Sequence, residues 1–189
     1  MEIKKNHLLV LAENQQIETP RLWLRPVTMA DAEDLFEYAK DEETTEFVFP
    51  THRSLADTKV AIATYFLAAP LGKYAIEEKG NGKMIGTIDL RVDPIKEVAE
   101  LGYTLNKAFW GQGIVPEAAS MLLYLGFEEL ELVRIYALHD QRNHRSGRVM
   151  EKIGMKVEAQ IPAARKFRGQ IVDEVMRGIT REEWQKRIM

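Results

Sequence analysis

The hydrophobic pattern of this chain changes near residue 109, and this change restricts the folds that the chain can adopt. Before it, three segments alternate apolar and polar residues as half-buried strands do: 72–78, 82–92 and 97–107. The turn signal Asn81–Gly82 predicts a hairpin between the first two. After it, helix and strand patterns alternate, as in parallel strands joined by helices: helix 116–130, strand 132–138, helix 143–154 and strand 155–161. We therefore predict a mixed α/β sheet, antiparallel at first and partly parallel later.

The same patterns place the remaining elements. Thr28 and Ser54 are expected to cap two helices, because their side chains can accept hydrogen bonds from the first helical turn. The further elements are strand 17–27, helix 28–41, helix 54–70, strand 171–179 and helix 180–188. We expect one domain spanning 1–189, with a central twisted sheet of about six or seven strands flanked by helices.

Composition excludes several classes of protein and of site. The chain has 189 residues, with 26 basic and 29 acidic side chains and a formal net charge of -3. Nucleic-acid-binding proteins usually carry a basic excess, so we expect no nucleic-acid partner. The absence of cysteine excludes disulfides, thiolate catalysis and cysteine-based metal sites. The four histidines lack the pair spacing of a helical zinc site, so we expect no metal.

Membrane and secretion signals are also missing from the sequence. No apolar run approaches the length of a membrane-spanning helix. The N-terminal stretch has only a short apolar core, LLVLA, and no small-residue cleavage site, so we do not expect a signal peptide. These features lead us to expect a cytoplasmic protein with no membrane partner.

The stretch FWGQGIVPEA, residues 109–118, places two glycines just before a predicted helix. Pro116 suits the first helical position, because its missing N–H would have no partner within the helix. The other amides of that first turn point outward, with the positive end of the helix dipole behind them. Because Gly111 and Gly113 carry no side chains, a phosphate could approach these amides. The alternative is a tight turn between strand and helix that binds nothing.

Two other nucleotide-binding motifs do not fit this stretch. A Walker loop needs a lysine followed by serine or threonine after its last glycine, but Ile114 and Val115 stand there. A dinucleotide-binding fingerprint needs a third glycine or alanine where Pro116 stands. A second notable stretch, residues 143–154, has Asn143 where a helix should begin and Gly154 where it should end. By itself, this second stretch is explained by helix capping.

Taken together and in chain order, these stretches resemble the GNAT superfamily of acetyl-CoA-dependent N-acetyltransferases, and most closely its ribosomal-protein (Rim-type) branch. The resemblance covers nearly the whole chain. The stretches that carry it are IETPRLWLRPVTMADAEDLFEY, IGTIDL, AELGYTLNKAFWGQGIVPEA, NHRS and EKIGM. The resemblance implies a GNAT-like fold, in which the fourth and fifth strands, here 97–107 and 132–138, splay apart around the cofactor.

The resemblance also implies which residues bind acetyl-CoA, the co-substrate. Trp110, Gly111, Gln112, Gly113, Ile114 and Val115 correspond to the pyrophosphate loop. Trp110 and Val115 depart from the family pattern of Gln or Arg first and a small residue last. The pantetheine arm corresponds to the strand that ends at Tyr103, Thr104 and Leu105, and to Asn143 and Ser146. Physically, the two amides of pantetheine can pair with a strand edge.

The implied chemistry is direct attack of a primary amine on the thioester. Backbone amides near Leu105 are candidates to polarise the thioester carbonyl. Glu100 corresponds to the family's acidic position and is our candidate base, acting through water, with Asp89 as the second candidate. Glu100 could equally be an ordinary exposed strand carboxylate. Met150 stands where many relatives have a proton-donating tyrosine, so Ser146 is proposed as the acid, unless it only stabilises the helix start.

Other residues are expected to bind the two substrates. Phe47 and Phe49 are expected to line the acceptor entrance, beside Asp89, although core packing would explain the two aromatics as well. Three arginines near the second stretch are candidates for the 3′-phosphate, or form an ordinary solvated basic face: Arg142, Arg145 and Arg148.

The acceptor is expected to be a protein N-terminal α-amine. Such an amine titrates at about 7.8 and a lysine amine at about 10.4, so a site without an evident strong base suits the α-amine better. Alternatives are a small-molecule acetyltransferase for a polyamine, an amino sugar or an amino acid, a non-catalytic acyl-CoA sensor, and a plain interaction domain. A homodimer is possible.

Overall fold

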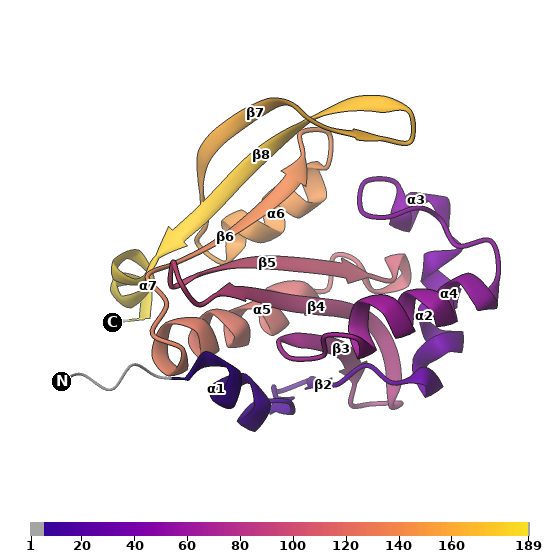
Figure 1. Cartoon of the computed structure of the whole chain (residues 1–189), viewed down its shortest axis with the longest axis horizontal. Helices are drawn as coiled ribbons and strands as arrows, with labels where there is room; N and C mark the ends of the chain where they lie inside the picture. Colours follow the sequence, from indigo (N-terminus) through magenta and orange to yellow (C-terminus); the bar gives the residue numbers. More distant parts are fainter. Residues whose placement is uncertain (1–5, 189) are drawn as a thin grey trace.

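The computed structural model describes residues 6–188 and contains an eight-stranded mixed sheet (Figure 1). The expectation of one domain over 1–189 stays a prediction, and its residues 1–5 and 189 lie outside the described range. In spatial order the strands are β1 (Ile17–Glu18), β2 (Leu22–Arg25), β3 (Lys73–Glu78), β4 (Lys83–Asp93), β5 (Val98–Leu105), β6 (Arg134–Asp140), β8 (Gln170–Thr180) and β7 (Lys156–Phe167).

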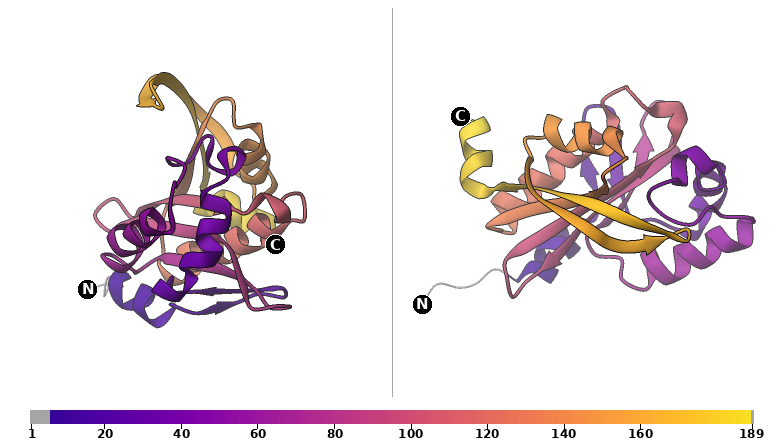
Figure 2. Two further views of the ribbon diagram at one scale, coloured as in Figure 1. Left: turned by 90° about the vertical axis from the view of Figure 1, so that its right-hand side faces the viewer. Right: turned by 90° about the horizontal axis from the view of Figure 1, so that it is seen from above.

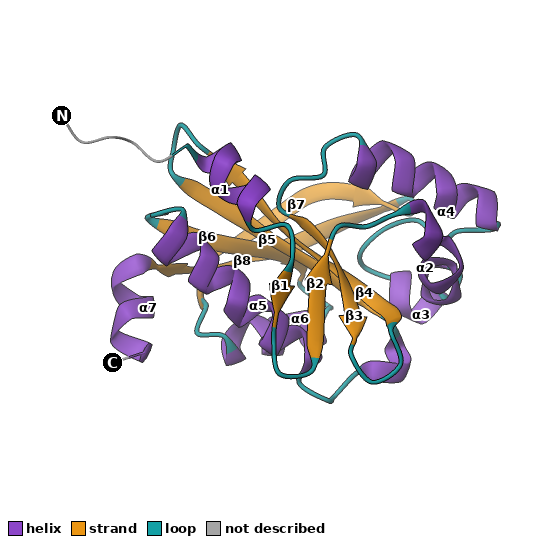
Figure 3. Ribbon diagram, turned by 90° about the horizontal axis from the view of Figure 1, so that it is seen from below, coloured by secondary structure: helices purple, strands orange, loops and turns teal. Residues whose placement is uncertain are grey.

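Helices cover both faces of the sheet (Figures 2 and 3). Those that pack on one face are α1 (His7–Glu13), α5 (Ile114–Tyr124), α6 (His144–Lys152) and α7 (Arg181–Ile188). The other face carries α2 (Ala32–Ala39), α4 (Leu55–Ala61) and the π-helical continuation of α4, Ile62–Leu67. The short α3 (Glu42–Thr45) follows α2. A second π-helical segment, Leu125–Glu129, extends α5, and short 3-10 turns span Met29–Asp31 and Lys107–Phe109.

Each face has its own hydrophobic core. The larger core includes Leu101 of β5, Leu122 of α5 and Trp184 of α7, and all three are nearly inaccessible to solvent. The smaller core joins α2 to β4, with Tyr38 and Met84 in contact. Burial of these apolar side chains is the main stabilisation of the fold. Because the sheet lies between the two cores, residues on its opposite faces reach different surroundings.

Local signals in the sequence placed most elements correctly. Ser54 accepts a hydrogen bond from Asp57 N and caps α4, and Thr28 forms a capping box with Asp31. Strands β3 and β4 form the predicted antiparallel hairpin. Two helices were not predicted, α1 and α3.

The strand count was wrong, because segment 17–27 forms two strands and not one. Thr19, Pro20 and Arg21 turn the chain between β1 and β2, which pair antiparallel. Proline cannot donate to a strand ladder, so it favours a turn here. Segment 17–27 therefore contributes two strands, and the sheet has eight.

The expected run of parallel strands was also wrong beyond its first pair. Only β5 and β6 pair in parallel within the described residues, and β6 pairs antiparallel with β8. Strand β8 lies between β6 and β7, so the helical crossover through α6 does not place β7 beside β6. A two-residue turn at Arg168 and Gly169, both with positive φ, joins β7 to β8. Such turns match the natural twist of a hairpin.

The single parallel pair separates after three residue pairs. Val98, Ala99 and Glu100 pair with residues of β6, the last with Tyr136. Beyond this point β5 continues to Leu105 along β4, with no β6 partner. The sheet therefore splays between β5 and β6, as the family resemblance implied.

We predict that Gly86 is required for the pairing of β4 with β5 at this position. A Cβ on Gly86 would lie 2.4 Å from Thr104 O and 3.1 Å from Leu105 Cα. Gly86→Ala should therefore lower the free energy of unfolding by about 1–3 kcal/mol, the usual cost of overpacking. Gly80→Ala is the matched control, because a Cβ on Gly80 meets nothing within 4 Å. Urea denaturation that gives equal midpoints for the two variants would contradict this prediction.

Candidate active site

A cavity of about 610 Å³ lies where β5 and β6 separate. It extends to the loop before α5, the start of α6, and α3 with the chain after it. The predicted cofactor residues that line it are Tyr103, Thr104, Leu105, Trp110, Gly111, Gly113, Ile114, Val115, Asn143 and Ser146. Of the predicted set only Gln112 is not in the lining. The structure therefore brings residues 103–115 and residues 143–146, which are separate in sequence, to one cavity.

The two glycines of the loop both need a left-handed backbone. Gly111 has φ 77° and Gly113 has φ 75°, a region that side chains disfavour. A Cβ on Gly111 would meet no atom within 4 Å, so the loop is open at this position. Position 111 therefore requires glycine because of its backbone conformation and not because neighbouring atoms would collide with a side chain.

Helix α5 begins at Ile114, two residues earlier than predicted, with Gly113 as its N-cap. Pro116 is therefore the third helical residue and not the first. The first bond within the helix runs from Glu117 N to Gly113 O at 3.1 Å, so the amides of Gly113, Ile114 and Val115 have no acceptor within α5. Pro116 has no amide to leave unpaired. Val115, which departs from the family pattern, is buried in the larger core and also lines the cavity.

The free edge of β5 offers further donors. Asn106 N donates to Ile85 O at 2.8 Å, which fixes the alternation of hydrogen-bonded pairs along β4 and β5. By this alternation the backbone groups of Leu101, Tyr103 and Leu105 face the gap left by β6. Leu105 O accepts from Trp110 Nε1 at 2.8 Å. The amides of Tyr103 and Leu105 therefore remain on the gap side, where the family resemblance expects the pantetheine arm.

The start of α6 is tied to β5. Asn143 Oδ1 accepts from Ser146 N at 3.1 Å and caps the helix. Tyr103 donates its hydroxyl to Ser146 O at 3.0 Å. Met150 is buried, so its position offers neither a donor nor an accessible side chain. Ser146 is half-buried in the cavity wall, and its role as an acid stays a prediction.

Basic side chains of α6 and of the preceding loop dominate the charge of the cavity. Arg142, Arg145 and Arg148 line it, as does Lys152, which the sequence analysis missed. The spacing of 145, 148 and 152 places these residues on one helical face, a signal that could have found Lys152. The guanidinium of Arg145 stacks on the Trp110 ring at 4.3 Å. This arrangement favours an anionic ligand.

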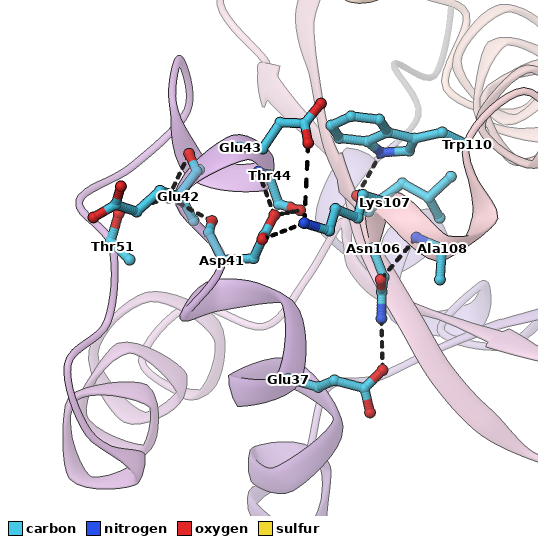
Figure 4. Close-up of polar contacts among 12 residues, drawn as sticks. Glu37, Asp41, Glu42, Glu43, Thr44, Thr51, Asn106, Lys107, Ala108 and Trp110 are labelled. Atoms are coloured by element: carbon cyan, nitrogen blue, oxygen red, sulfur yellow. Dashed lines mark hydrogen bonds and ion pairs between the residues drawn. The ribbon is translucent and has the colours of Figure 1, made fainter.

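Glu43 of α3 also lines the cavity and lies beside Lys107 (Figure 4). Glu43 Oε1 accepts from Arg145 Nη1 at 3.0 Å, across the cavity. Lys107 Nζ donates to Asp41 Oδ1 at 2.5 Å and lies 3.9 Å from Glu43 Oε2. The sequence analysis expected the segment TTEFVFPTHRS, residues 44–54, at the acceptor entrance, and its residues Thr44, Glu46, Phe47 and Val48 line the cavity. It did not find Glu43, because α3 was not predicted.

Phe47 lines the cavity, whereas Phe49 does not. Phe49 packs against the smaller core, with its ring 5.4 Å from that of His52. The chain around Phe47 is held by the β7–β8 hairpin, because Arg165 Nη2 donates to Phe47 O at 3.0 Å. Arg168 Nη2 makes a similar bond of 2.8 Å to Thr51 Oγ1.

The two candidate bases are not among the cavity-lining residues. Asp89 and Glu100 lie on the sheet face that carries α4, and both accept hydrogen bonds from Arg91, with 2.7 Å from Arg91 Nη2 to Glu100 Oε1. Tyr65 donates its hydroxyl to Asp89 Oδ2 at 2.8 Å. Burial raises the pKa of Asp89, and the charge of Arg91 opposes this rise. Glu100 also marks the residue where β5 and β6 separate.

Comparison with known proteins agrees with this geometry. The family model described as Acetyltransferase (GNAT) domain matches residues 21–156, so the chain belongs to the GNAT acetyltransferase family. Enzymes of this family use acetyl-CoA. The chain is 27% identical to "Uncharacterized N-acetyltransferase p20" of Bacillus licheniformis, over 90% of this chain and 98% of that protein.

Two further matches add to this. "Putative ribosomal N-acetyltransferase YdaF" of Bacillus subtilis is 33% identical over 56% of this chain and 58% of its own length. A GNAT-family acetyltransferase structure from Bacillus anthracis superposes with a TM-score of 0.80 at 26% identity, covering 88% of this chain and 99% of the other. The mixed sheet flanked by helices is thus a GNAT fold.

Two further features are absent from residues 6–188. No group of three or more His, Asp or Glu side chains there could hold a metal ion. None of the helices in that range combines the length and apolar character needed to cross a bilayer.

We predict that Gly111→Ala weakens acetyl-CoA binding about tenfold or more. Its loss of folding stability should be no larger than that of the control variant Gly82→Ala. Alanine at a positive φ costs about 1–2 kcal/mol, which the loop would relieve by moving its amides. Gly82→Ala is the matched control, because Gly82 has φ 67° and equally open surroundings but lies in the β3–β4 turn. Calorimetric titration with acetyl-CoA should separate the two variants. Equal affinity would show that the conformation at Gly111 does not matter for binding.

Proposed function

We propose that this acetyltransferase transfers the acetyl group of acetyl-CoA to a primary amine, preferentially the α-amine at a protein N-terminus. The observation that carries the proposal is the continuous cavity that joins the gap between β5 and β6 to the open start of α5. Its donors and its charge match a ligand that has a diphosphate at one end and an amide-containing arm at the other.

The position of each residue in the cavity indicates which part of acetyl-CoA it would bind. The amides of Gly113, Ile114 and Val115 would hold the diphosphate, with Arg145 nearby. The free β5 edge at Tyr103 and Leu105 would bind the arm and polarise the thioester carbonyl. Acetyl-CoA supplies the acetyl group as a thioester, which the amine attacks directly.

The surroundings of the candidate bases support an α-amine acceptor. Arg91 bonds both Asp89 and Glu100, so these two carboxylates are already paired with a cation and would attract a polycation less. At pH 7, deprotonation costs about 1 kcal/mol for an α-amine and about 4.6 kcal/mol for a lysine amine. A carboxylate such as Glu100, acting through water, therefore suits the α-amine better. The partial match to a relative named as a ribosomal N-acetyltransferase agrees with this acceptor.

A peptide panel tests the acceptor. One peptide has a free N-terminus and no lysine, and its matched partner has a blocked N-terminus and one lysine. Thiol release from acetyl-CoA should be faster with the first peptide at pH 7, because less of its amine is protonated. Faster release with the lysine peptide, or with a free polyamine, would contradict the α-amine preference.

Thermal and chemical unfolding with acetyl-CoA separate an enzyme from a sensor. A ligand at 100 times its dissociation constant should add about 2.7 kcal/mol to the free energy of unfolding. Stabilisation without thiol release for any amine would favour a non-catalytic acyl-CoA sensor. An unchanged unfolding midpoint would contradict binding itself.

We further predict that Glu100→Gln lowers kcat about a hundredfold, as expected for loss of a general base. Glutamine keeps an oxygen for Arg91, so folding should persist. Glu158→Gln is the matched control, since Glu158 pairs with Arg134 and is 31% exposed, against 29% for Glu100. If the two variants have the same kcat, Glu100 is not the base, and Asp89→Asn becomes the decisive variant.

A further inference from the structure

The turn between β1 and β2 contacts the start of α5, although the sequence analysis gave the stretch IETPRLWLRPV no function. Arg21 Nε donates to Glu117 Oε2 at 2.6 Å, and Arg21 N donates to Glu117 Oε1 at 2.9 Å. Thr19 Oγ1 donates to the same Oε1 at 2.6 Å. These bonds join segments 96 and 98 residues apart in sequence.

The same guanidinium also holds the glycine loop. Arg21 Nη1 donates to Gln112 O at 2.9 Å, between the two glycines. Arg21 Nη2 lies 3.7 Å from the position that a Cβ on Gly113 would take. One planar group therefore bonds both the loop and the helix that follows it. A guanidinium offers several donors in a fixed arrangement, which an ammonium group cannot reproduce.

The charge of Glu117 makes this contact relevant to an anionic ligand. Glu117 lies in the first turn of α5, where the helix dipole favours a carboxylate. Burial alone raises the pKa of Glu117, but hydrogen bonds from Thr19 and Arg21 outweigh it and hold the pKa below its usual value. Glu117 is therefore ionised at neutral pH, close to the amides that would bind a phosphate. Unless it is neutralised, it would repel such a ligand.

We propose that Arg21 is a positioning residue for acetyl-CoA binding: it fixes the glycine loop through Gln112 and neutralises Glu117, so that the amides at the start of α5 can bind a diphosphate. The inference rests on the proposed function. This role differs from a direct contact between Arg21 and a phosphate group, for which any cation at position 21 would suffice. It also differs from a purely structural role, which would change stability without changing the affinity for acetyl-CoA.

Three variants test this inference, and each is measured for its acetyl-CoA Kd, its KM and kcat, and its free energy of unfolding. Arg21→Gln should raise Kd and KM about tenfold, equal to about 1.4 kcal/mol, with kcat within about twofold of wild type. Arg21→Lys should lose nearly as much, because lysine cannot bond Glu117 and Gln112 together. The double variant Arg21→Gln/Glu117→Gln should bind more tightly than Arg21→Gln, because the unpaired carboxylate is gone.

Lys79→Gln is the matched control. Lys79 also forms an ion pair at this end of the sheet, 2.6 Å from Glu18 Oε1, and its ammonium group lies over the ring of Trp23. It should bind acetyl-CoA like the wild type. If Arg21→Gln alone does not fold, Arg21→Lys and the double variant still provide the comparison.

Several results would overturn the inference. Wild-type affinity in Arg21→Gln would remove any role in binding, and wild-type affinity in Arg21→Lys would reduce the role to charge alone. A double variant no tighter than Arg21→Gln would show that Arg21 does not act by neutralising Glu117. A wild-type protein that does not bind acetyl-CoA would overturn the proposed function as well, whereas the other results leave that function intact.

Discussion

The separation of β5 from β6 after Glu100 is the constraint on which the rest of the site depends. A buried strand edge must find partners for its backbone groups, because an unpaired amide or carbonyl costs free energy. Along Leu101 to Leu105 this edge has no β6 partner, so it is available to a ligand that can pair with a strand. The family resemblance identifies such a ligand, since pantetheine carries two amides.

The same separation explains how distant segments share one cavity. Strand β6 pairs with β8 and leads to the start of α6, while β5 leads directly into the glycine loop and α5. The cavity is thus bounded by two helix starts, one capped by Asn143 and one with Gly113 as its N-cap. The basic face of α6 and the open amides of α5 therefore face one cavity, where both would act on the proposed ligand.

The two faces of the sheet carry different groups of polar side chains. The cavity wall next to α5 and α6 holds the residues proposed to bind the cofactor, whereas the opposite face holds Asp89, Arg91 and Glu100 in one hydrogen-bonded group. Residues i and i+1 of a strand point to opposite faces, so neighbours in β5 can serve opposite sides of the sheet.

Sequence by itself determined the features set by local chemistry. The left-handed glycines at 111 and 113, the caps at Ser54 and Asn143, and the Asn81–Gly82 hairpin follow from the conformations that these residue types allow. The family resemblance added the splay and most of the cavity lining. The tertiary structure alone decided that β8 separates β6 from β7, that Glu43 of α3 reaches Arg145, and that Arg21 bonds Glu117. These depend on strand order and on contacts between segments about a hundred residues apart, and no local pattern in the sequence encodes such distances.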